Sequence, residues 1–488
     1  MSPLPDWLDP IYEAAEMRAV DAWAIEDQGV PQDELMERAA LGLARVTAAA
    51  ADAGPIRIVV GKGNNGGDGR VAARFLEEDG HEVELIDGTE SFDPERLEGS
   101  GVVVDALLGT GFEGAPREPV ASAIAAINAQ GAPVVACDVP SGVNASTGEV
   151  EAEAVRAAVT ATFHGSKVGL HVNPGKAHAG RIEVTEIGIP RGAPTPGAAG
   201  LISERVLDLY PRRTRSGSKF ESGVVVVVGG SMGLTGAPTM AARSAQRAGA
   251  GYVQVAVPGP VQPAVDLRLL EQMSRGLPDD DGFHTPEGVA VVEEMAERAG
   301  AVVLGPGLGR SESAQEFARG VAVAVEAPLL VDADGLNAHA GRLELFRERE
   351  APTVLTPHEA ELGRLLEKGT EEVAAHRVAC AREAAELSGA LVLLKGDDTI
   401  VARPGDPLAI SPGGTPALAT AGTGDVLSGL IGALLAKRMD AFEAAALGAL
   451  AHVLAARSAA ERLGADHVMA GDVIESLPRG LTLHVRPR

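Results

Sequence analysis

The residues IRIVVGKGNNGGDGRVAARFLEE, at positions 56–78, decide the fold of the first part of the chain. The mostly apolar run Ile56–Val60 predicts a buried strand, and residues 70–78 predict a helix. The turn between them contains the pattern G-x-G-x-x-G, formed by Gly61, Gly63 and Gly66. Such a turn between strand and helix is typical of dinucleotide-binding α/β folds when an acidic residue ends the next strand. Asp87 occupies that place.

The same alternation continues on the C-terminal side of this stretch. Further apolar runs predict strands at residues 81–86, 101–108, 132–139 and 181–189. Continuous apolar strands separated by helices predict a parallel sheet with helices on both faces, a Rossmann-like doubly wound α/β domain. The segment RGAPTPGAAG, residues 191–200, predicts a linker because it is rich in Pro, Gly and Ala. We therefore place the first domain at residues 1–200.

A second series of strands and helices follows the linker. Its predicted strands are residues 223–230, 252–257, 301–307, 328–334, 353–358 and 391–396. A helical region of small and apolar residues is expected from Asp425 to about Leu463. The 488-residue length suits more than one domain. We place a second α/β domain, different from the first, at residues 201–488.

Composition excludes several classes of protein. The net charge of −26 argues against a nucleic-acid binder, which needs a cationic face. No apolar run is long enough to span a membrane, and the acidic N-terminal segment does not resemble a secretory signal. Two distant cysteines, Cys137 and Cys380, make no disulfide framework. We therefore expect a cytoplasmic protein without nucleic-acid or membrane partners.

The first glycine-rich turn carries polar side chains as well as glycines. Asn64, Asn65 and Asp68 lie inside the run NNGGDG. A phosphate cradle needs only backbone N–H groups, so two amides and a carboxylate indicate that the turn also binds polar groups or a cation. A tight turn that uses Asn for positive φ is the alternative, and it explains one Asn but not the whole run.

Two more loops with acidic residues follow predicted strands: DALLGTGFEGAPR at 105–117 and DVPSG at 138–142. Loops at the carboxyl ends of parallel strands converge on one crevice. We therefore expect four polar residues to meet there: Asn65, Asp105, Asp138 and Ser141. Oxygen ligands without His or Cys suit a hard cation rather than zinc. Taken singly, each Asp is more commonly a turn former or a helix cap.

These motifs, together with TFHGSKVGL at 162–170, resemble those of the NAD(P)H-hydrate epimerases over essentially the whole first domain. The resemblance implies that the hydrated dinucleotide is held by Asn64, Asn65, Gly66, Gly67 and Asp68 and by Gly109, Thr110, Gly111, Phe112, Glu113, Gly114 and Ala115. It implies a potassium ion on Asn65, Asp105 and Ser141. It also places Asp138 at the nicotinamide hydrate and makes Lys167 a second catalytic candidate, with a solvated surface lysine as the alternative.

The most specific motif of the second domain is ATAGTGDVLSG, residues 419–429. Backbone N–H groups of Gly422, Thr423 and Gly424, at the positive end of a helix, predict an anion hole for a phosphate. Asp425 opens the helix beside that hole, where a carboxylate can accept the proton of a substrate hydroxyl during phosphoryl transfer. A glycine-rich turn capped by Asp is the alternative.

This ensemble resembles the ribokinase superfamily, and most closely its ADP/ATP-dependent NAD(P)H-hydrate dehydratases, from about Ser216 to the C-terminus. The resemblance implies that the hydrate contacts Ala237, Gly309, His358 and Asp425. It implies that the nucleotide, ADP, is held by Lys395, Gly396, Asp397, Asp398, Thr399 and Gly424, and that Glu361 organises magnesium. The implied reaction is phosphorylation of the hydrate's hydroxyl followed by loss of phosphate. For a lone His, helix capping is the usual alternative to ligand binding.

Both resemblances together predict a metabolite-repair enzyme that epimerises hydrated NADH and NADPH and dehydrates the S form at the expense of ADP. A hydroxymethyl-type small-molecule kinase fused to a Rossmann domain is the alternative enzyme, and an RNA-decay scaffold is the non-enzymatic one. We expect a homo-oligomer. The choice between ADP and ATP, and between the NADH and NADPH hydrates, stays open.

Overall fold

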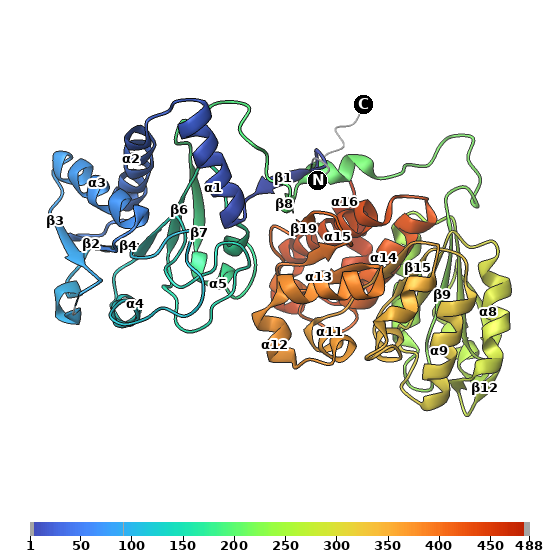
Figure 1. The fold of residues 1–488 in the computed structure, drawn as a ribbon. Coiled ribbons are helices and arrows are strands. Elements are labelled where there is room, and N and C mark those ends of the chain that lie inside the picture. The colour runs from blue at the N-terminus through green and yellow to red at the C-terminus, as the bar shows by residue number, and fades with distance from the viewer. Residues whose placement is uncertain (1–3, 91, 483–488) are drawn as a thin grey trace. The chain divides into compact units, whose positions relative to one another are not determined.

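The chain folds into two compact units, as seen in a computed structural model that describes residues 4–90 and 92–482 (Figure 1). The first unit is built mainly from residues Pro10–Gly200, and the second mainly from Leu201–Val373 and the residues from Val378 onward. Residues Pro5–Asp9 also belong to the second unit.

The first unit is built around a six-stranded sheet. Its strands are β2 (Ile56–Val60), β3 (Val83–Asp87), β4 (Val102–Ala106), β5 (Val134–Cys137), β6 (Val159–Phe163) and β7 (Arg181–Thr185). All five pairings are parallel, in the order β3-β2-β4-β5-β6-β7. The chain thus steps from β2 to one side and then returns to the other side at β4. The carboxyl ends of β2 and β4 form the switch point of an open α/β sheet, where ligands bind.

Helices cover both faces of this sheet. They are α1 (Ala14–Ala22), α2 (Gln32–Ala50), α3 (Asn64–Glu78), α4 (Val120–Ala129) and α5 (Lys176–Ala179). One apolar core joins α2 and α3 to alternate residues of the central strands, among them Ile58 and Val104. A second core joins α4 to the opposite face through residues such as Val59 and Val103. The alternation follows from the period of two in side-chain direction along a strand.

The structure corrects the prediction that the run NNGGDG is a loop. Helix α3 begins at Asn64, six residues before the predicted start, and Gly63 precedes it with extended backbone. Asn65 and Asp68 therefore stand on the first turns of a helix and are buried. Asn and Gly favour helices weakly, so local propensity hides this helix, and packing against α2 and the sheet overrides the propensity.

The second unit holds an eleven-stranded sheet. Its strands are β1 (Leu8–Ile11), β8 (Ala199–Ile202), β9 (Val224–Val228), β10 (Tyr252–Pro258), β11 (Met273–Leu277), β14 (Ala301–Leu304), β15 (Leu329–Val331), β16 (Thr353–Leu355), β17 (Leu391–Leu394), β18 (Ile400–Ala402) and β19 (Leu408–Ile410). The order is β1-β8-β19-β18-β17-β16-β15-β14-β9-β10-β11, and the pairings from β11 to β17 are parallel. A short hairpin pairs β12 (Asp279–Asp280) with β13 (Phe283–His284).

The longer helices of the second unit pack on this sheet. The unit's helices are α6 (Gly236–Arg247), α7 (Gln262–Asp266), α8 (Val289–Ala296), α9 (Glu312–Ala324), α10 (Asp334–Asn337), α11 (Glu359–Leu366), α12 (Thr370–Ala375), α13 (Arg377–Ser388), α14 (Thr423–Ala436), α15 (Ala441–Leu463) and α16 (Ala470–Gly480). Helices α6 and α14 pack together against β9 and its neighbours. Right-handed crossovers place α6 and α9 on opposite faces, because the chain moves in opposite directions from β9 and from β14. The switch point lies between β9 and β14.

The predicted fold class, a Rossmann-like doubly wound α/β sheet followed by a second α/β domain, is confirmed. Two boundaries differ from expectation. Strand β8 begins at Ala199, so the last two residues of the predicted linker are part of a sheet. The helical region after residue 425 is two helices, and α14 already begins at Thr423, where Gly422 takes the left-handed conformation.

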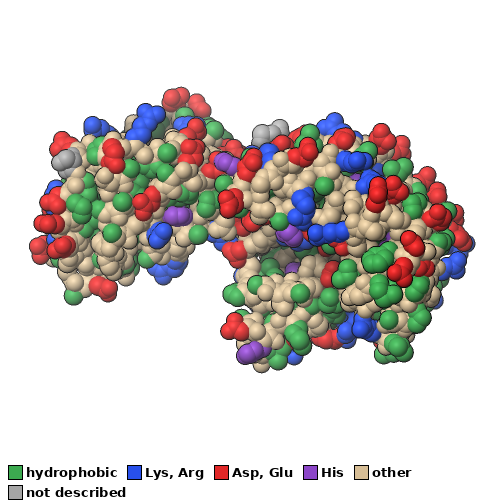
Figure 2. Space-filling model, turned by 90° about the horizontal axis from the view of Figure 1, so that it is seen from below, with side chains coloured by type: hydrophobic (Ala, Val, Ile, Leu, Met, Phe, Trp, Pro, Cys, Tyr) green, Lys and Arg blue, Asp and Glu red, His purple; other side chains and the backbone are tan. Residues whose placement is uncertain are grey.

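Acidic side chains are spread over the visible face of both units, with basic side chains between them (Figure 2). Among residues 4–90 and 92–482, no helix is long and apolar enough to cross a membrane.

Candidate functional site

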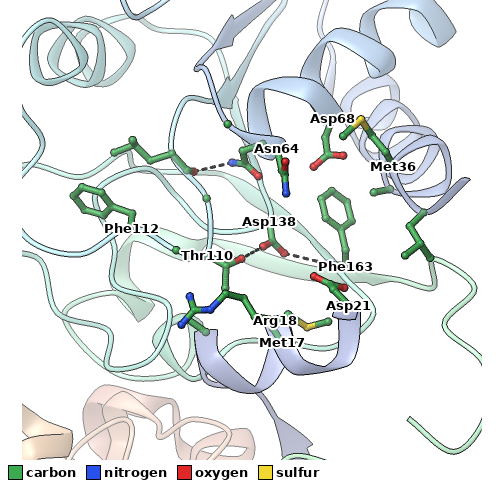
Figure 3. A pocket seen from close by; sticks show the side chains of 18 of the residues that line it. Met17, Arg18, Asp21, Met36, Asn64, Asp68, Thr110, Phe112, Asp138 and Phe163 are labelled. Atoms are coloured by element: carbon green, nitrogen blue, oxygen red, sulfur yellow. Dashed lines mark hydrogen bonds between the residues drawn. The ribbon is translucent and has the colours of Figure 1, made fainter. Parts of the chain in front are cut away.

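A cavity of about 670 Å³ lies in the first unit at the switch point of its sheet. Its walls come from α1, α2 and α3 and from the segments that follow β4, β5 and β6 (Figure 3). Nine residues of the predicted site line it: Asn64, Asn65, Asp68, Gly109, Thr110, Gly111, Phe112, Asp138 and Lys167. Parts of all three predicted loops therefore reach the cavity, although the first of them is the start of helix α3.

Some predicted residues do not line this cavity. They are Gly66, Gly67, Glu113, Gly114 and Ala115, with Asp105 and Ser141 behind the wall. Gly66 has a packing reason instead, because a Cβ there would lie 2.0 Å from the carbonyl oxygen of Gly61. Asp87 is exposed and accepts a hydrogen bond from the backbone N–H of Thr89 at 2.8 Å, while Thr89 itself lines the cavity. The expected role of Asp87 in the dinucleotide fingerprint stays a prediction.

Asp138 and Lys167 form a buried ion pair at the cavity wall. The distance from Lys167 Nζ to Asp138 Oδ1 is 2.5 Å, and the lysine side chain is 1 % exposed. Lys167 also donates to Thr162 Oγ1 at 2.9 Å and to the Phe163 carbonyl oxygen at 3.0 Å. This placement contradicts the alternative of a solvated surface lysine. The lysine is buried because the short loop after β6 turns its side chain back toward Thr162 and Phe163 at the end of that strand.

The Asp138 carboxylate is held in its charged form. Burial alone would raise its pKa, but Lys167 and hydrogen bonds from Thr110 and the Phe163 backbone N–H outweigh burial and lower the pKa of Asp138 below its ordinary value. Thr162 donates a further hydrogen bond at 3.0 Å. The backbone of Asp138 is left-handed, with φ at 64°, which is strained for a residue other than Gly. Such strain is common where a carboxylate must point into a site.

Two of the predicted cation ligands, Asn65 and Ser141, contact the carbonyl oxygen of Leu108, and the third, Asp105, contacts Ser141. Asn65 Nδ2 donates to that oxygen at 2.7 Å, and Ser141 Oγ lies 3.4 Å from it. Ser141 Oγ also donates to Asp105 Oδ1 at 2.6 Å, and the Ser141 backbone N–H donates to Asp105 Oδ2 at 2.8 Å. The Asp105 carboxylate, the Ser141 hydroxyl and the Leu108 carbonyl oxygen are thus close together, and the amide nitrogen of Asn65 faces them while it also donates to the Cys137 carbonyl oxygen at 2.8 Å.

Asp105 is fully buried, and burial raises its pKa to about 6 despite the hydrogen bonds from Ser141. None of the ion pairs within residues 4–90 and 92–482 includes it. Over the same residues, no three His, Cys, Asp or Glu side chains are grouped to hold a metal ion. The local donor set thus has a single carboxylate among neutral oxygens.

Several cavity residues escaped the sequence analysis. Asp21, Arg18 and Met36 reach the cavity from α1 and α2 (Figure 3). Burial raises the pKa of Asp21, and it raises the pKa of Asp68 to about 8, with contributions from Asp138 and Asp21. No local motif marks Asp21, because it follows the apolar pattern of an ordinary amphipathic helix and contacts the site only through the fold.

In the second unit, the motif around Asp425 forms the N-terminus of α14. Gly422 is the N-cap, with φ at 91°, a conformation that favours Gly. The first turn then exposes backbone N–H groups at the positive end of a helix, as an anion hole requires. Asp425 stands in that first turn. The structure thus places the predicted base beside the predicted anion hole.

Lys395 lies at this helix end, where a Cβ on Gly424 would be 3.7 Å from its Nζ. The lysine donates to Asp332 Oδ1 at 2.8 Å, and Glu361 Oε2 is 3.5 Å from its Nζ. Ser428 of α14 donates to the other oxygen of Asp332 at 2.6 Å. Burial alone would lower the pKa of Lys395, but Asp332 and Glu361 outweigh it and raise the pKa. A fixed cation therefore faces the anion hole.

Asp425 has an altered affinity for protons at this position. Burial, with a contribution from the charge of Asp332, outweighs the opposing charge of Lys395 and raises the pKa of Asp425 to about 7. A carboxyl group with a pKa near 7 is suited to accept and release a proton at neutral pH. Asp332 and Ser428 were missed by the sequence analysis, although the acidic residues that end the apolar run at 328–334 were a usable signal.

The other predicted residues of the second unit have identifiable contacts. His358 caps α11, where its Nδ1 accepts a hydrogen bond from the backbone N–H of Ala360 at 3.1 Å. This is the helix-capping role that was the alternative to ligand binding. The backbone N–H of His358 donates to Glu361 Oε2 at 2.9 Å. Gly309, at φ 89°, donates its N–H to Asp334, and Ala237 lies at the start of α6.

The predicted nucleotide segment also makes contacts within the unit. Asp397 Oδ1 accepts from the Gly414 backbone N–H at 2.8 Å, and Thr399 Oγ1 donates to the carbonyl oxygen of Gly396 at 2.9 Å. Asp398 is buried. The segment that includes these residues begins at Lys395, directly after β17. It therefore lies at the carboxyl edge of the sheet.

Family models match both units. Residues 225–479 match the family described as NAD(P)H-hydrate dehydratase. Residues 32–93 and 86–169 match the YjeF-related protein N-terminus family.

Relatives match over nearly the whole chain. The chain is 39 % identical to a bifunctional NAD(P)H-hydrate repair enzyme of Salinibacter ruber, with 96 % of each protein covered. It is 37 % identical to the enzyme of the same name from Moorella thermoacetica, again with 96 % of each covered.

Solved structures resemble the second unit. An ADP/ATP-dependent NAD(P)H-hydrate dehydratase from Bacillus subtilis, co-crystallised with ATP and Mg²⁺, is 28 % identical with a TM-score of 0.50, covering 57 % of this chain and 96 % of that one. A ribokinase-like superfamily protein from Enterococcus faecalis, 24 % identical with a TM-score of 0.50, covers 59 % of this chain and 96 % of that one. The predicted ribokinase-like fold is thereby confirmed.

Proposed function

Since the chain belongs to the bifunctional NAD(P)H-hydrate repair enzymes, we propose that its first unit epimerises hydrated NADH and NADPH and its second unit dehydrates the S epimer. The observation that carries this proposal is the presence of two separate reaction centres on one chain. One is the carboxylate-lined cavity of the first unit, and the other is the anion hole with Asp425 and Lys395 in the second. A small-molecule kinase fused to a Rossmann domain would leave the first centre without a purpose.

In the second unit, Asp425 accepts the proton of the hydrate's hydroxyl as that oxygen attacks the terminal phosphoryl group of ADP. Backbone N–H groups at the start of α14 and the Lys395 ammonium stabilise the charge on the migrating group. Loss of phosphate and of a ring proton then restores the double bond. Asp425 must be ionised before the reaction to act as the base. Its pKa of about 7 means that a substantial fraction is ionised at neutral pH.

A divalent cation accompanies the nucleotide in this proposal. Glu361 is the residue that suits such a cation, because its carboxylate is 6 % exposed and lies 3.5 Å from Lys395 Nζ. Magnesium, when bound, would offset the charge of the phosphates. Glu361 would orient its shell, and the segment from Lys395 to Thr399 would hold the nucleotide.

In the first unit, Asp138 is the fixed anion that receives the nicotinamide hydrate. Its ion pair with Lys167 and its hydrogen bond from Thr110 hold one orientation, so the carboxylate needs no reorganisation when the substrate enters. Asn64 and the segment from Gly109 to Phe112 would hold the remainder of the dinucleotide, because they line the same cavity.

The experiment that tests this function uses an equal mixture of the two NADH-hydrate epimers. With ADP and magnesium, we expect the full chain to convert both epimers to NADH, with the yield followed by chromatography against an enzyme-free control. Without ADP, only interconversion should occur. Recovery of one epimer unchanged would show that the first unit is not an epimerase, and NADH formation without nucleotide would refute the phosphoryl-transfer scheme.

We also propose that potassium binds Asn65, Asp105 and Ser141 in the first unit. Asp105 is buried without a cationic side chain in ion-pair contact among residues 4–90 and 92–482, and a monovalent cation would offset its charge. Bound there, it would fix the loop after β4 against the start of α3. The modest charge of the ligand set suits a monovalent rather than a divalent ion.

Rubidium provides the measurement for this site. Crystals grown in rubidium with saturating dinucleotide should show anomalous density between Asn65, Asp105 and Ser141. The Asp105→Asn variant should lose that density, whereas Asp79→Asn, an exposed change at the end of helix α3, should keep it. Absence of the signal from the wild-type protein would remove potassium from the account.

A further inference from the structure

Two carboxylates of the first unit's cavity have no assigned chemistry, and they approach it from different helices. Asp68 stands on α3 and Asp21 on α1, and both line the cavity together with Asp138. In Figure 3 the side chains of Asp68, Asp21 and Asp138 point into the same space. The cavity therefore offers an acidic group on each of two sides.

Asp68 differs from Asp138 in its partners. Both are buried, at 8 % and 7 % exposure. Asp138 is held by Lys167, Thr110 and Thr162, whereas no hydrogen bond or ion pair to the Asp68 side chain is present within residues 4–90 and 92–482. A carboxyl group that is nine-tenths buried and lacks a partner is costly to ionise. It is favoured in the neutral form, in which it can donate a proton.

The charged groups around the cavity reinforce this difference. Burial and the charges of Asp138 and Asp21 raise the pKa of Asp68 to about 8, although Lys167, which is paired with Asp138, opposes the rise. The pKa of Asp21 is raised as well, chiefly by burial. Arg18 and Lys62 also line the cavity. When environments push the pKa values of neighbouring carboxyls apart, the groups take different roles.

We propose that Asp68 and Asp21 are catalytic acid–base residues that act on opposite faces of the hydrated nicotinamide ring, while Asp138 remains the anion that stabilises the charged intermediate. The proposal rests on the epimerase function proposed above and names the groups that carry it out. It assigns to α1 a catalytic residue that no motif of the sequence marks.

The chemistry follows from the substrate. Water adds to the C=C–N unit of a dihydropyridine with its hydroxyl on the carbon bonded to nitrogen, so the epimers differ at a carbon that bears both oxygen and nitrogen. Asp68 donates its proton to the hydroxyl as the C–O bond breaks, and water leaves. The nitrogen lone pair forms the C=N⁺ bond of an iminium ion, whose positive charge the Asp138 carboxylate offsets.

A second water then adds from the other face. Asp21, in its ionised form, accepts a proton from that water as the new C–O bond forms, and the electron pair of the C=N⁺ bond returns to nitrogen. Proton exchange with solvent restores Asp68 to its acid form and Asp21 to its base form. The opposite epimer reacts by the same steps with the two residues exchanged, so one site serves both directions.

Replacement of each carboxyl by an amide tests the residues. Asp68→Asn and Asp21→Asn should each lower kcat for interconversion in both directions, by about 10²–10⁴-fold, with KM changed far less. Asp79→Asn, an exposed change at the end of the same helix α3, is the matched control and should keep the wild-type rate. Wild-type kcat in either cavity variant would overturn the proposal.

Oxygen labelling tests the bond that breaks and needs no variant. In H₂¹⁸O, each epimer formed by the wild-type protein should carry ¹⁸O at its hydroxyl, at a rate above that of an enzyme-free control. Retention of the original oxygen during interconversion would overturn the proposal but leave the epimerase function standing. Failure of the wild-type protein to interconvert the epimers at all would instead refute the proposed function.

Discussion

Replacing Asp425 with Asn is expected to lower the rate of dehydration about 10²–10⁴-fold and to leave interconversion of the epimers at its wild-type rate. Asn keeps the size of Asp and is tolerated in the first turn of a helix, so α14 should still form. It cannot accept the proton of the hydrate's hydroxyl. The epimerase centre belongs to the other compact unit and shares no residue with this one.

The pKa of Asp425 also predicts how the dehydration rate changes with pH. The pKa of Asp425 is raised to about 7, and a general base works in its ionised form. The dehydration rate should therefore rise as the pH increases through about 7 and level off above it, and Asp425→Asn should remove this limb. Asp466→Asn, on an exposed residue of the same unit, is the control. Normal dehydration by the Asp425 variant would show that the phosphoryl-transfer assignment is wrong.

Replacing Lys167 with Met is expected to lower the free energy of unfolding of the first unit by about 3–5 kcal/mol, because it strands the Asp138 carboxylate in a buried position. The side chains of the pair are 1 % and 10 % exposed, so solvent compensates little for the lost ammonium. Thr110 and Thr162 would still donate hydrogen bonds, but they carry no charge. Epimerisation should fall with the loss of the fixed anion.

Tryptophan fluorescence can measure the free energy of unfolding of the first unit separately from that of the second. The chain has two tryptophans, Trp7 in the second unit and Trp23 in the first. Trp7→Phe leaves Trp23, which packs against the core of the first unit, as the only reporter of urea unfolding. A matched control is Arg181→Met, which breaks an exposed pair with Glu183 and should cost about 1 kcal/mol or less.

A double variant separates charge from packing at this pair. Asp138→Asn added to Lys167→Met removes the stranded charge, so it should recover part of the lost stability while leaving epimerisation impaired. Equal instability of the single and double variants would mean that the lysine acts through packing. Unchanged stability of Lys167→Met would contradict the buried ion pair itself.

Sequence patterns predicted the parts of the fold that depend on apolar runs. Strand β2 has its predicted bounds, Ile56–Val60, because a short run rich in Ile and Val favours a buried strand. The start of α3 at Asn64 was not predictable in this way, because Asn and Gly have low helix propensity and the helix is stabilised by its contact with α2.

The residues of the candidate sites likewise divide into those that local sequence patterns predict and those that depend on tertiary packing. Asn65, Asp105 and Ser141 follow predicted strands, and the carboxyl edge of a parallel sheet brings them together. Asp21 and the inward turn of Lys167 were inaccessible to local patterns, since both depend on how distant segments pack. Function could be inferred from the motifs, whereas the proton affinities that divide the carboxylates into roles required burial and partners.

The most direct test of two activities on one chain starts from the R epimer of NADH hydrate alone. Chromatography over time should show the S epimer appearing first and NADH following it when ADP and magnesium are present. In the absence of ADP, the reaction should stop at a mixture of the two epimers, reached faster than in an enzyme-free control. Persistence of the R epimer with ADP present, or NADH formed from it without the S epimer ever appearing, would contradict the account.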